Sequence, residues 1–189
     1  MVALLRLLLV GAVFIASARA DLQLTPKISE SWVDGAKIKL LAFSDGSGKD
    51  VTYGPPTGWE YSGNSTRFSL HPPKKPQALG TITSIKLSHP AVFDDETMKT
   101  LMAEVLASVP AGSADVTLVS QEKNPLMIAR KETFLIIVSY TFYGENYQRS
   151  MMFLNRGSEQ VRFQFVSHAV DFRELQAAFQ RSHLTWQNL

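Results

Sequence analysis

A regular alternation of apolar and polar residues between positions 134 and 165 constrains the fold of this chain most strongly. Successive side chains of a β-strand point to opposite faces, so alternation at period two predicts strands. Gly144-Glu145 predicts a type II′ two-residue turn between the first two strands. We therefore expect an antiparallel meander whose aromatic residues form one apolar sheet surface. Its alternating residues are Phe134, Ile136, Val138, Tyr140, Phe142, Tyr147, Arg149, Met151, Phe153, Val161, Phe163 and Phe165.

The end of the chain carries the pattern of an amphipathic helix. Asp171 and Glu174 have the spacing of a capping box, and Val170 with Leu175 have that of a hydrophobic staple. One helical face is formed by Phe172, Leu175, Phe179, Ser182 and Trp186. We expect this helix to cover the aromatic surface of the meander.

The rest of the mature chain reads mainly as strands. Asp34-Gly35 predicts a hairpin turn between strands at 28–33 and 36–43. Further strands are expected at 50–53, 66–70, 79–87 and 115–121. A helix follows Pro90, capped by Asp94 or Asp95 and ended by Pro110-Ala111-Gly112. This order predicts an α+β fold, a central largely antiparallel sheet with helices packed on its faces.

The first twenty residues have the pattern of an export signal. Arg6 precedes an apolar run over Leu7–Ala16, and Ala18-Arg19-Ala20 resembles a cleavage site. The apolar run is shorter than the roughly 20 residues that span a bilayer. We expect cleavage near Ala20 and a soluble protein, periplasmic or secreted. The expected organisation is a signal peptide at 1–20, a hairpin extension at 21–49 and an α+β domain at 50–189.

Composition narrows the possible chemistry. The chain has no cysteine, which excludes disulfides, thiolate nucleophiles and cysteine-bound metals. Its 19 basic and 17 acidic residues become equal in number when Arg6 and Arg19 leave with the signal. A neutral chain has no broad basic surface for nucleic acid, so no nucleic-acid partner is expected.

The sequence predicts no catalytic, cofactor or metal site. The four histidines, His71, His89, His168 and His183, lack the spacing of a helical zinc site and read as exposed or capping residues. The run at 46–49 lacks the spacing of a phosphate-binding loop and of a calcium loop.

One segment stands out as a candidate partner-binding surface. Two prolines stiffen the stretch from 53 to 61, and aromatic residues bracket it, as at many interfaces. Its candidate residues are Tyr53, Pro55, Pro56, Trp59 and Tyr61. The alternative interpretation places Trp59 in the edge of the core, where the chain changes direction.

The order of these elements resembles a known superfamily. It is carried by Pro55-Pro56-Thr57-Gly58-Trp59 leading into a strand, by one helix and a three-stranded meander, and by a final helix that ends at Trp186. Over roughly residues 50–187, the chain resembles the superfamily of the PsbP extrinsic proteins of photosystem II and the Ran-release import factors. The resemblance implies an α/β/α sandwich and a non-catalytic role in binding proteins or stabilising assemblies.

These observations predict a non-catalytic exported protein that binds or stabilises a partner in the cell envelope. Two alternatives stay open. One is a hydrolase that uses Asp or Glu with water in a cleft near Trp59, because carboxylate pairs leave no spacing signature. The other is a carrier of a small ligand or lipid, which needs a sizeable apolar cavity behind the meander.

Overall fold

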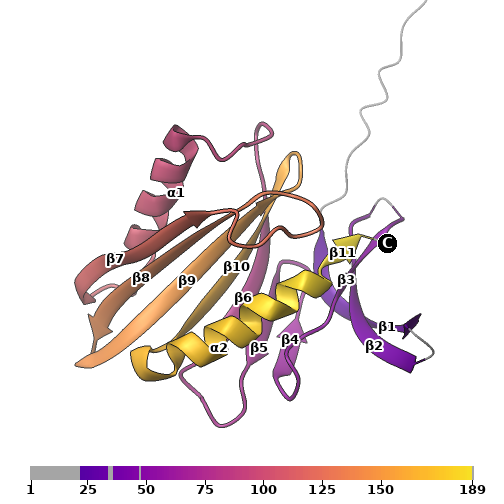
Figure 1. The fold of residues 1–189 in the computed structure, drawn as a ribbon, viewed down its shortest axis with the longest axis horizontal. Coiled ribbons are helices and arrows are strands. Elements are labelled where there is room, and N and C mark those ends of the chain that lie inside the picture. Colours follow the sequence, from indigo (N-terminus) through magenta and orange to yellow (C-terminus); the bar gives the residue numbers. More distant parts are fainter. Residues whose placement is uncertain (1–21, 34–35, 47, 189) are drawn as a thin grey trace, which may run out of the picture.

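The protein folds around two antiparallel sheets. The computed structural model describes residues 22–33, 36–46 and 48–188, and Figure 1 shows their arrangement. Within these residues a seven-stranded sheet has the order β4-β5-β6-β10-β9-β8-β7, and a four-stranded sheet has the order β1-β2-β3-β11. All the paired strands run antiparallel. The α+β prediction is confirmed.

Most strands begin and end close to the positions predicted from the alternation. The small sheet contains β1 (Gln23–Val33), β2 (Ala36–Ser44), β3 (Asp50–Tyr53) and β11 (Gln187–Asn188). The large sheet contains β4 (Glu60–Gly63), β5 (Arg67–His71), β6 (Leu79–Lys86), β7 (Ala114–Lys123), β8 (Thr133–Phe142), β9 (Glu145–Asn155) and β10 (Glu159–His168). The predicted hairpin of β1 and β2 is present, and its Asp34-Gly35 turn lies outside the described residues.

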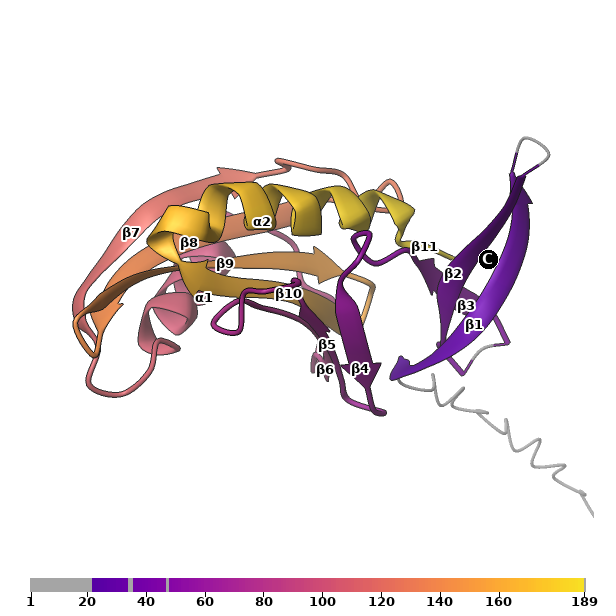
Figure 2. The same ribbon diagram turned by 90° about the horizontal axis from the view of Figure 1, so that it is seen from below.

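The two α-helices of the described residues lie on opposite faces of the large sheet, as Figure 2 shows edge-on. The α1 helix (Asp95–Ala107) contacts β7 and β8, and we call its side of the sheet the α1 face. The α2 helix (Ala169–Ser182) contacts β9 and β10 on the α2 face. Asp94 caps α1, and its hydrogen bonds from Thr97 hold the pKa of the Asp94 carboxyl below its ordinary value.

The prediction of a single aromatic surface is wrong. Phe134 and Phe153 pack under α1, whereas Phe163 and Phe165 pack under α2. The reason is register: β10 pairs Phe163 with Met152, so odd residues of β10 share a face with even residues of β9. A hairpin with a two-residue turn pairs odd with even positions, so the α1 face carries the even residues of β8, the odd residues of β9 and the even residues of β10. Both faces are therefore apolar, and each has its own helix.

The predicted turn of the β8–β9 hairpin is wrong by one residue. Phe142 pairs with Glu145, which leaves Tyr143-Gly144 as the turn. Both turn residues have positive φ, 49° and 79°, as a type I′ turn requires. Moving a turn by one residue moves the register by two, so Tyr147 keeps its predicted face although it pairs with Tyr140.

The predicted start of the last helix is also wrong. The α2 helix begins at Ala169, and the preceding residue, His168, makes no side-chain capping bond. Asp171 lies within the first turn, where its carboxylate accepts a hydrogen bond from Lys75 Nζ at 2.6 Å. Val170 is 90% exposed, so no staple forms. The predicted buried face is present, with Phe172, Phe179 and Ser182 buried.

The C-terminus joins the two sheets. After α2, a 3-10 turn η1 (His183–Thr185) brings Trp186 into the core and β11 alongside β3. The Trp186 ring lies 5.7 Å from Phe43 of the small sheet and 5.2 Å from Phe163 of the large sheet. One apolar core therefore lies between α2 and both sheets.

Candidate partner-binding site

The 53–61 segment mostly faces the interior. Tyr53 is fully buried, and its hydroxyl shares a 2.7 Å hydrogen bond with Ser182 Oγ. Burial raises the pKa of the Tyr53 phenol, so this group stays protonated. Trp59 stacks on Phe179 with 6.3 Å between ring centroids and 4° between planes. The alternative interpretation, in which Trp59 fills the edge of the core, agrees with this placement.

Three of the five candidate residues in this segment retain exposed surface. Pro55 and Pro56 are half-buried, and Tyr61 is 42% exposed where it packs on Phe68. Because Tyr53 and Trp59 point inward, the surface that this segment offers a partner is smaller than the sequence suggested. A role of Pro55, Pro56 and Tyr61 in binding stays a prediction.

A groove between α1 and β7 is a stronger candidate. It has a volume of about 330 Å³, and Met98 and Met102 of α1 line it together with the buried ring of Phe134. Lys99 and Lys123 also line it, one on each element. Methionine side chains adapt to different apolar shapes, so this lining suits a variable apolar side chain. We call this feature the α1–β7 groove; its lining residues are Asp95, Met98, Lys99, Met102, Gln121, Lys123 and Phe134.

The strand beside this groove is an open sheet edge. In the described part of the chain, β7 pairs with β8 alone and ends the seven-stranded sheet. Its first part contains two bulges, whereas Ser120–Lys123 pairs regularly with Phe134–Ile137. Bulges discourage edge pairing, so the regular part beside the groove is the part suited to accept another strand. Leu118 and Val119 on β7 are also exposed.

A second cluster lies on the α1 face, beyond the C-terminal end of α1. Tyr140, Tyr147 and His168 are neighbours across β8, β9 and β10, because Tyr147 pairs with both of the others. The tyrosine rings stack with centroids 5.7 Å apart, and Tyr147 Oη shares a 2.9 Å hydrogen bond with His168 Nε2. Arg149 lies next to this row, with its guanidinium carbon 5.7 Å from the Tyr140 ring centroid. We call these four residues the Arg149 cluster.

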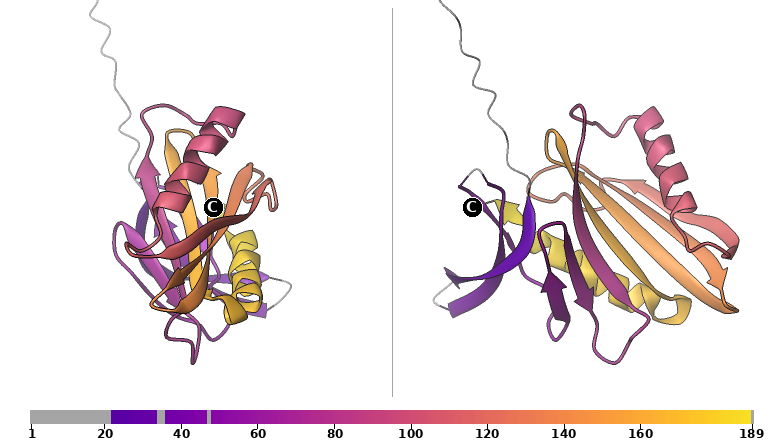
Figure 3. Two further views of the ribbon diagram at one scale, coloured as in Figure 1. Left: turned by 90° about the vertical axis from the view of Figure 1, so that its left-hand side faces the viewer. Right: turned by 180° about the vertical axis from the view of Figure 1, so that it is seen from behind.

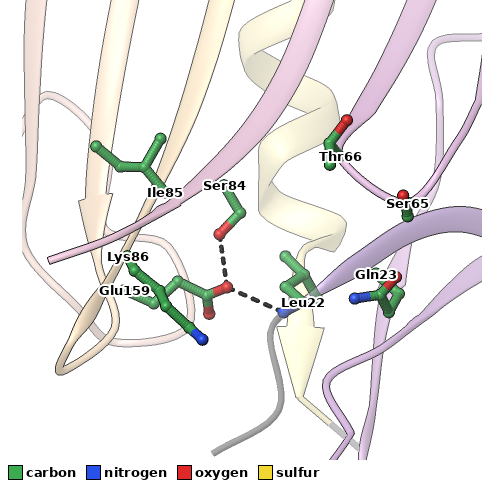
Figure 4. A pocket seen from close by; sticks show the side chains of 8 residues that line it. All are labelled: Leu22, Gln23, Ser65, Thr66, Ser84, Ile85, Lys86 and Glu159. Atoms are coloured by element: carbon green, nitrogen blue, oxygen red, sulfur yellow. Dashed lines mark hydrogen bonds between the residues drawn. The ribbon is translucent and has the colours of Figure 1, made fainter.

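A small polar cavity lies where β1 meets the large sheet. Figure 4 shows Glu159 at its centre, with Oε1 accepting hydrogen bonds from the Leu22 amide at 3.0 Å and from Ser84 Oγ at 2.5 Å. The other carboxylate oxygen accepts a hydrogen bond from Arg156 Nη1 at 3.2 Å. The volume is about 170 Å³. Since the carboxylate is fully engaged, Glu159 anchors the start of β1.

The histidines are spread over the structure. His71 and His89 are exposed, and His168 is half-buried. His183 occupies the C-cap position of α2, but its side chain is not exposed and does not cap the helix: it is 2% exposed, and neither ring nitrogen has a hydrogen-bond partner. Its ring packs against Phe163 and Phe179. Among residues 22–33, 36–46 and 48–188, no group of three His, Asp or Glu side chains is placed to hold a metal ion.

Neither the α1–β7 groove nor the Arg149 cluster was predicted as a site from the sequence. For the cluster a signal existed, because Arg149 is a charged residue at an inward position of an alternating strand. For the groove no local signal existed, since Met98 and Met102 read as an ordinary core face of a helix. Only the tertiary structure shows that β7, the last strand of the sheet, leaves the side chains of Met98 and Met102 partly exposed.

The comparisons with known proteins bear on the fold. No family model and no curated protein matches the chain. The solved structure of cyanobacterial PsbP (CyanoP) from Synechocystis sp. PCC 6803 has a TM-score of 0.52 at 11% identity, over 95% of this chain and 96% of CyanoP. The chain therefore has a PsbP-like fold, as the resemblance in sequence predicted.

Two further structures are similar at lower scores. LpqN of Mycobacterium tuberculosis, described as involved in cell envelope biogenesis, has a TM-score of 0.47 at 9% identity, over 86% of this chain and 91% of LpqN. Protein PA94 of Pseudomonas aeruginosa, described as a putative regulator of unknown function, has a TM-score of 0.44 at 13% identity, over 84% of this chain and 94% of PA94. In the described part of this chain, no helix has the length and apolarity to cross a bilayer.

Proposed function

We propose that this protein is a non-catalytic binding protein of the cell envelope that holds an extended segment of a partner protein at the α1–β7 groove. The observation that carries this proposal is the groove itself, a Met-lined hollow beside the regular part of an open edge strand. An edge strand supplies main-chain hydrogen bonds to an added strand, and the hollow receives one of its side chains. The partner segment is extended, with an apolar anchor.

The charges in the groove specify the partner further. Lys99 and Lys123 line the groove with one carboxylate, that of Asp95, and Lys123 Nζ also lies 3.8 Å from Glu132 Oε2. Lys99 is therefore the main cation that favours acidic residues beside the anchor. Lys123 Nζ donates to the carbonyl of Phe93 at 2.9 Å, which holds its charge near the hollow. The segment bound here is therefore apolar at its centre and acidic at its flanks.

The packing of the core favours a binding protein over a carrier. The region between α2 and the large sheet is filled with contacting rings, including Trp59, Phe165 and Phe179. A carrier needs an apolar cavity there.

In this proposal residues 1–20 are removed on export, residues 21–49 form a hairpin extension and 50–189 form the binding domain. N-terminal sequencing of protein recovered from the cell envelope is expected to begin at Asp21.

In-cell photocrosslinking tests the proposed surface. A photoreactive residue replaces Gln121 in the groove, or Arg173 on the exposed side of α2 as the control position. A discrete crosslinked product is expected at position 121 alone. It is expected to disappear when Met102→Lys places a charge in the hollow, and to persist in Val170→Lys, which changes an exposed apolar residue on the other helix.

Equal products at the two positions, or none at position 121, would contradict the proposed surface.

The proposal that the protein is not an enzyme is tested separately with ester, glycan and peptide substrates. Turnover that is abolished by replacing one carboxylate would overturn it in favour of a hydrolase.

A further inference from the structure

We propose that the Arg149 cluster is a binding site for a single carboxylate group. The proposal does not depend on the proposed function, because the cluster lies near the end of α1 whereas the groove lies beside its first turns. Figure 3 shows that α1 covers only one end of the α1 face. Tyr140, Tyr147 and His168 form a row across β8, β9 and β10, beyond the C-terminal end of α1.

The first argument is a buried charge without a counter-charge. Arg149 is 8% exposed, and no carboxylate in the described residues lies within ion-pair distance of its guanidinium. Its Nη1 donates to the carbonyl and the hydroxyl of Ser108 at the end of α1, but its buried Nε has no partner. A buried charge is stable only when paired or fully hydrogen-bonded, so this cation is suited to an external anion.

A neighbouring arginine provides the contrast. Arg162 of β10 lies on the α1 face, as Arg149 does. Its two terminal nitrogens donate to the two carboxylate oxygens of Glu104 on α1. It also donates through Nε to Gln160 at 3.0 Å. Arg162 thus has the bidentate partner that Arg149 lacks. The fold therefore gives one guanidinium an internal counter-charge and leaves the other without one.

The neighbours of Arg149 complete an anion site. Tyr147 and His168 are half-buried, so they connect the cluster to solvent, and both carry hydrogen-bonding groups. Burial raises the pKa of the Tyr140 phenol, with Arg149 opposing the rise, so Tyr140 is protonated and able to donate. The Tyr140 and Tyr147 rings stack on each other, which holds the Tyr147 hydroxyl in position beside His168.

Charge decides between oxyanions. The cluster has one permanent positive charge, which a carboxylate balances and a phosphate dianion exceeds. A carboxylate also matches the planar fork of a guanidinium. The ligand class is therefore a carboxylate, either of a small molecule or of an acidic side chain or C-terminus.

The test is a titration of the full mature chain at constant ionic strength, followed by the NMR resonances of Arg149 Hε and the His168 ring. Acetate is expected to shift both resonances saturably, with a Kd of about 1–10 mM for so small a ligand. Inorganic phosphate is expected to bind at least tenfold more weakly. An acidic hexapeptide with a blocked C-terminus tests side-chain carboxylates as the source.

Variants connect the binding to named groups. Arg149→Lys keeps the charge but loses the fork and is expected to weaken acetate binding at least tenfold. Tyr147→Phe removes only a hydroxyl and is expected to weaken it about threefold. Arg67→Lys, an exposed arginine of β5, is the matched control and is expected to change nothing.

Three outcomes overturn the proposal: no saturable shift with acetate, tighter binding of phosphate than of acetate, or unchanged binding in the variants. If thermal melting shows that Arg149→Lys does not fold, the comparison of Tyr147→Phe with the wild type decides the result.

Discussion

At the scale of single residues, His183 is the most unusual group in the core. Burial lowers its pKa to about 3, and neither ring nitrogen makes a hydrogen bond. The sequence did not indicate this burial, because a histidine directly after a helix is typical of an exposed capping position. Its position follows from η1, which turns the chain inward so that Trp186 can join the core.

We predict an acid-sensitive contribution of His183 to stability. In the unfolded chain histidine has a pKa of about 6.5, so below that pH the unfolded state binds a proton that the folded state excludes until about pH 3. The free energy of unfolding therefore falls as the pH drops through this window. Between pH 7.5 and pH 5.0 the loss due to His183 is about 2 kcal/mol.

Urea unfolding at the two pH values measures this effect. His183→Leu removes the titrating ring, so its loss of stability between the two pH values should be smaller than that of the wild type by that amount. His89→Gln, at an exposed position, is the control and should keep the wild-type difference. A wild-type pH dependence in His183→Leu would contradict the prediction.

At the scale of elements, the sequence predicted what depends on local patterns. The strands follow from the alternation of apolar and polar residues. The capping of α1 follows from the side chain of Asp94, and the buried face of α2 follows from the helical spacing of its apolar residues. The distribution of aromatics over two faces was not predicted, although Val161 and Phe163 alternate clearly. Their face depends on the number of residues in each turn, and a one-residue error there leaves the alternation pattern unchanged.

We predict that the β8–β9 turn contains removable strain. Tyr143 is 92% exposed and has a φ of 49°, a conformation that Asn and Gly adopt more readily than tyrosine. Tyr143→Asn should therefore stabilise the protein by about 0.5–1 kcal/mol and raise Tm by roughly 1–4 °C. Calorimetry measures this, with Tyr143→Val as a comparison that should lower Tm. A lower Tm in Tyr143→Asn would show that the contact of Tyr143 with Phe142 matters more.

At the scale of the whole molecule, Trp186 joins the two sheets into one core. It contacts Phe43 and Tyr53 of the small sheet and Phe163 of the large sheet. Apart from the charge of Arg149 on an alternating strand, the sequence does not reveal either the α1–β7 groove or the Arg149 cluster. The groove combines residues of α1, β7 and β8, and the cluster combines residues of β8, β9 and β10, so both depend on the tertiary fold.

We predict that Trp186→Ala destabilises both sheets together. Removing a buried tryptophan costs about 3–5 kcal/mol, through lost burial and the cavity left behind. Hydrogen exchange should accelerate in β2 and in β9 to a similar extent, measured by mass spectrometry. Leu184→Ala, at an exposed neighbouring position, should leave both rates unchanged. Acceleration confined to β2 would show that the small sheet unfolds independently.

The position of β10 in the strand order has a consequence for biosynthesis. This strand lies between β6 and β9, so it alone joins the first three strands of the large sheet to the last three. A ribosome that has translated only as far as Asn155 has made six of the seven strands but not the one that connects them. The nascent chain cannot complete its sheet until translation is nearly finished.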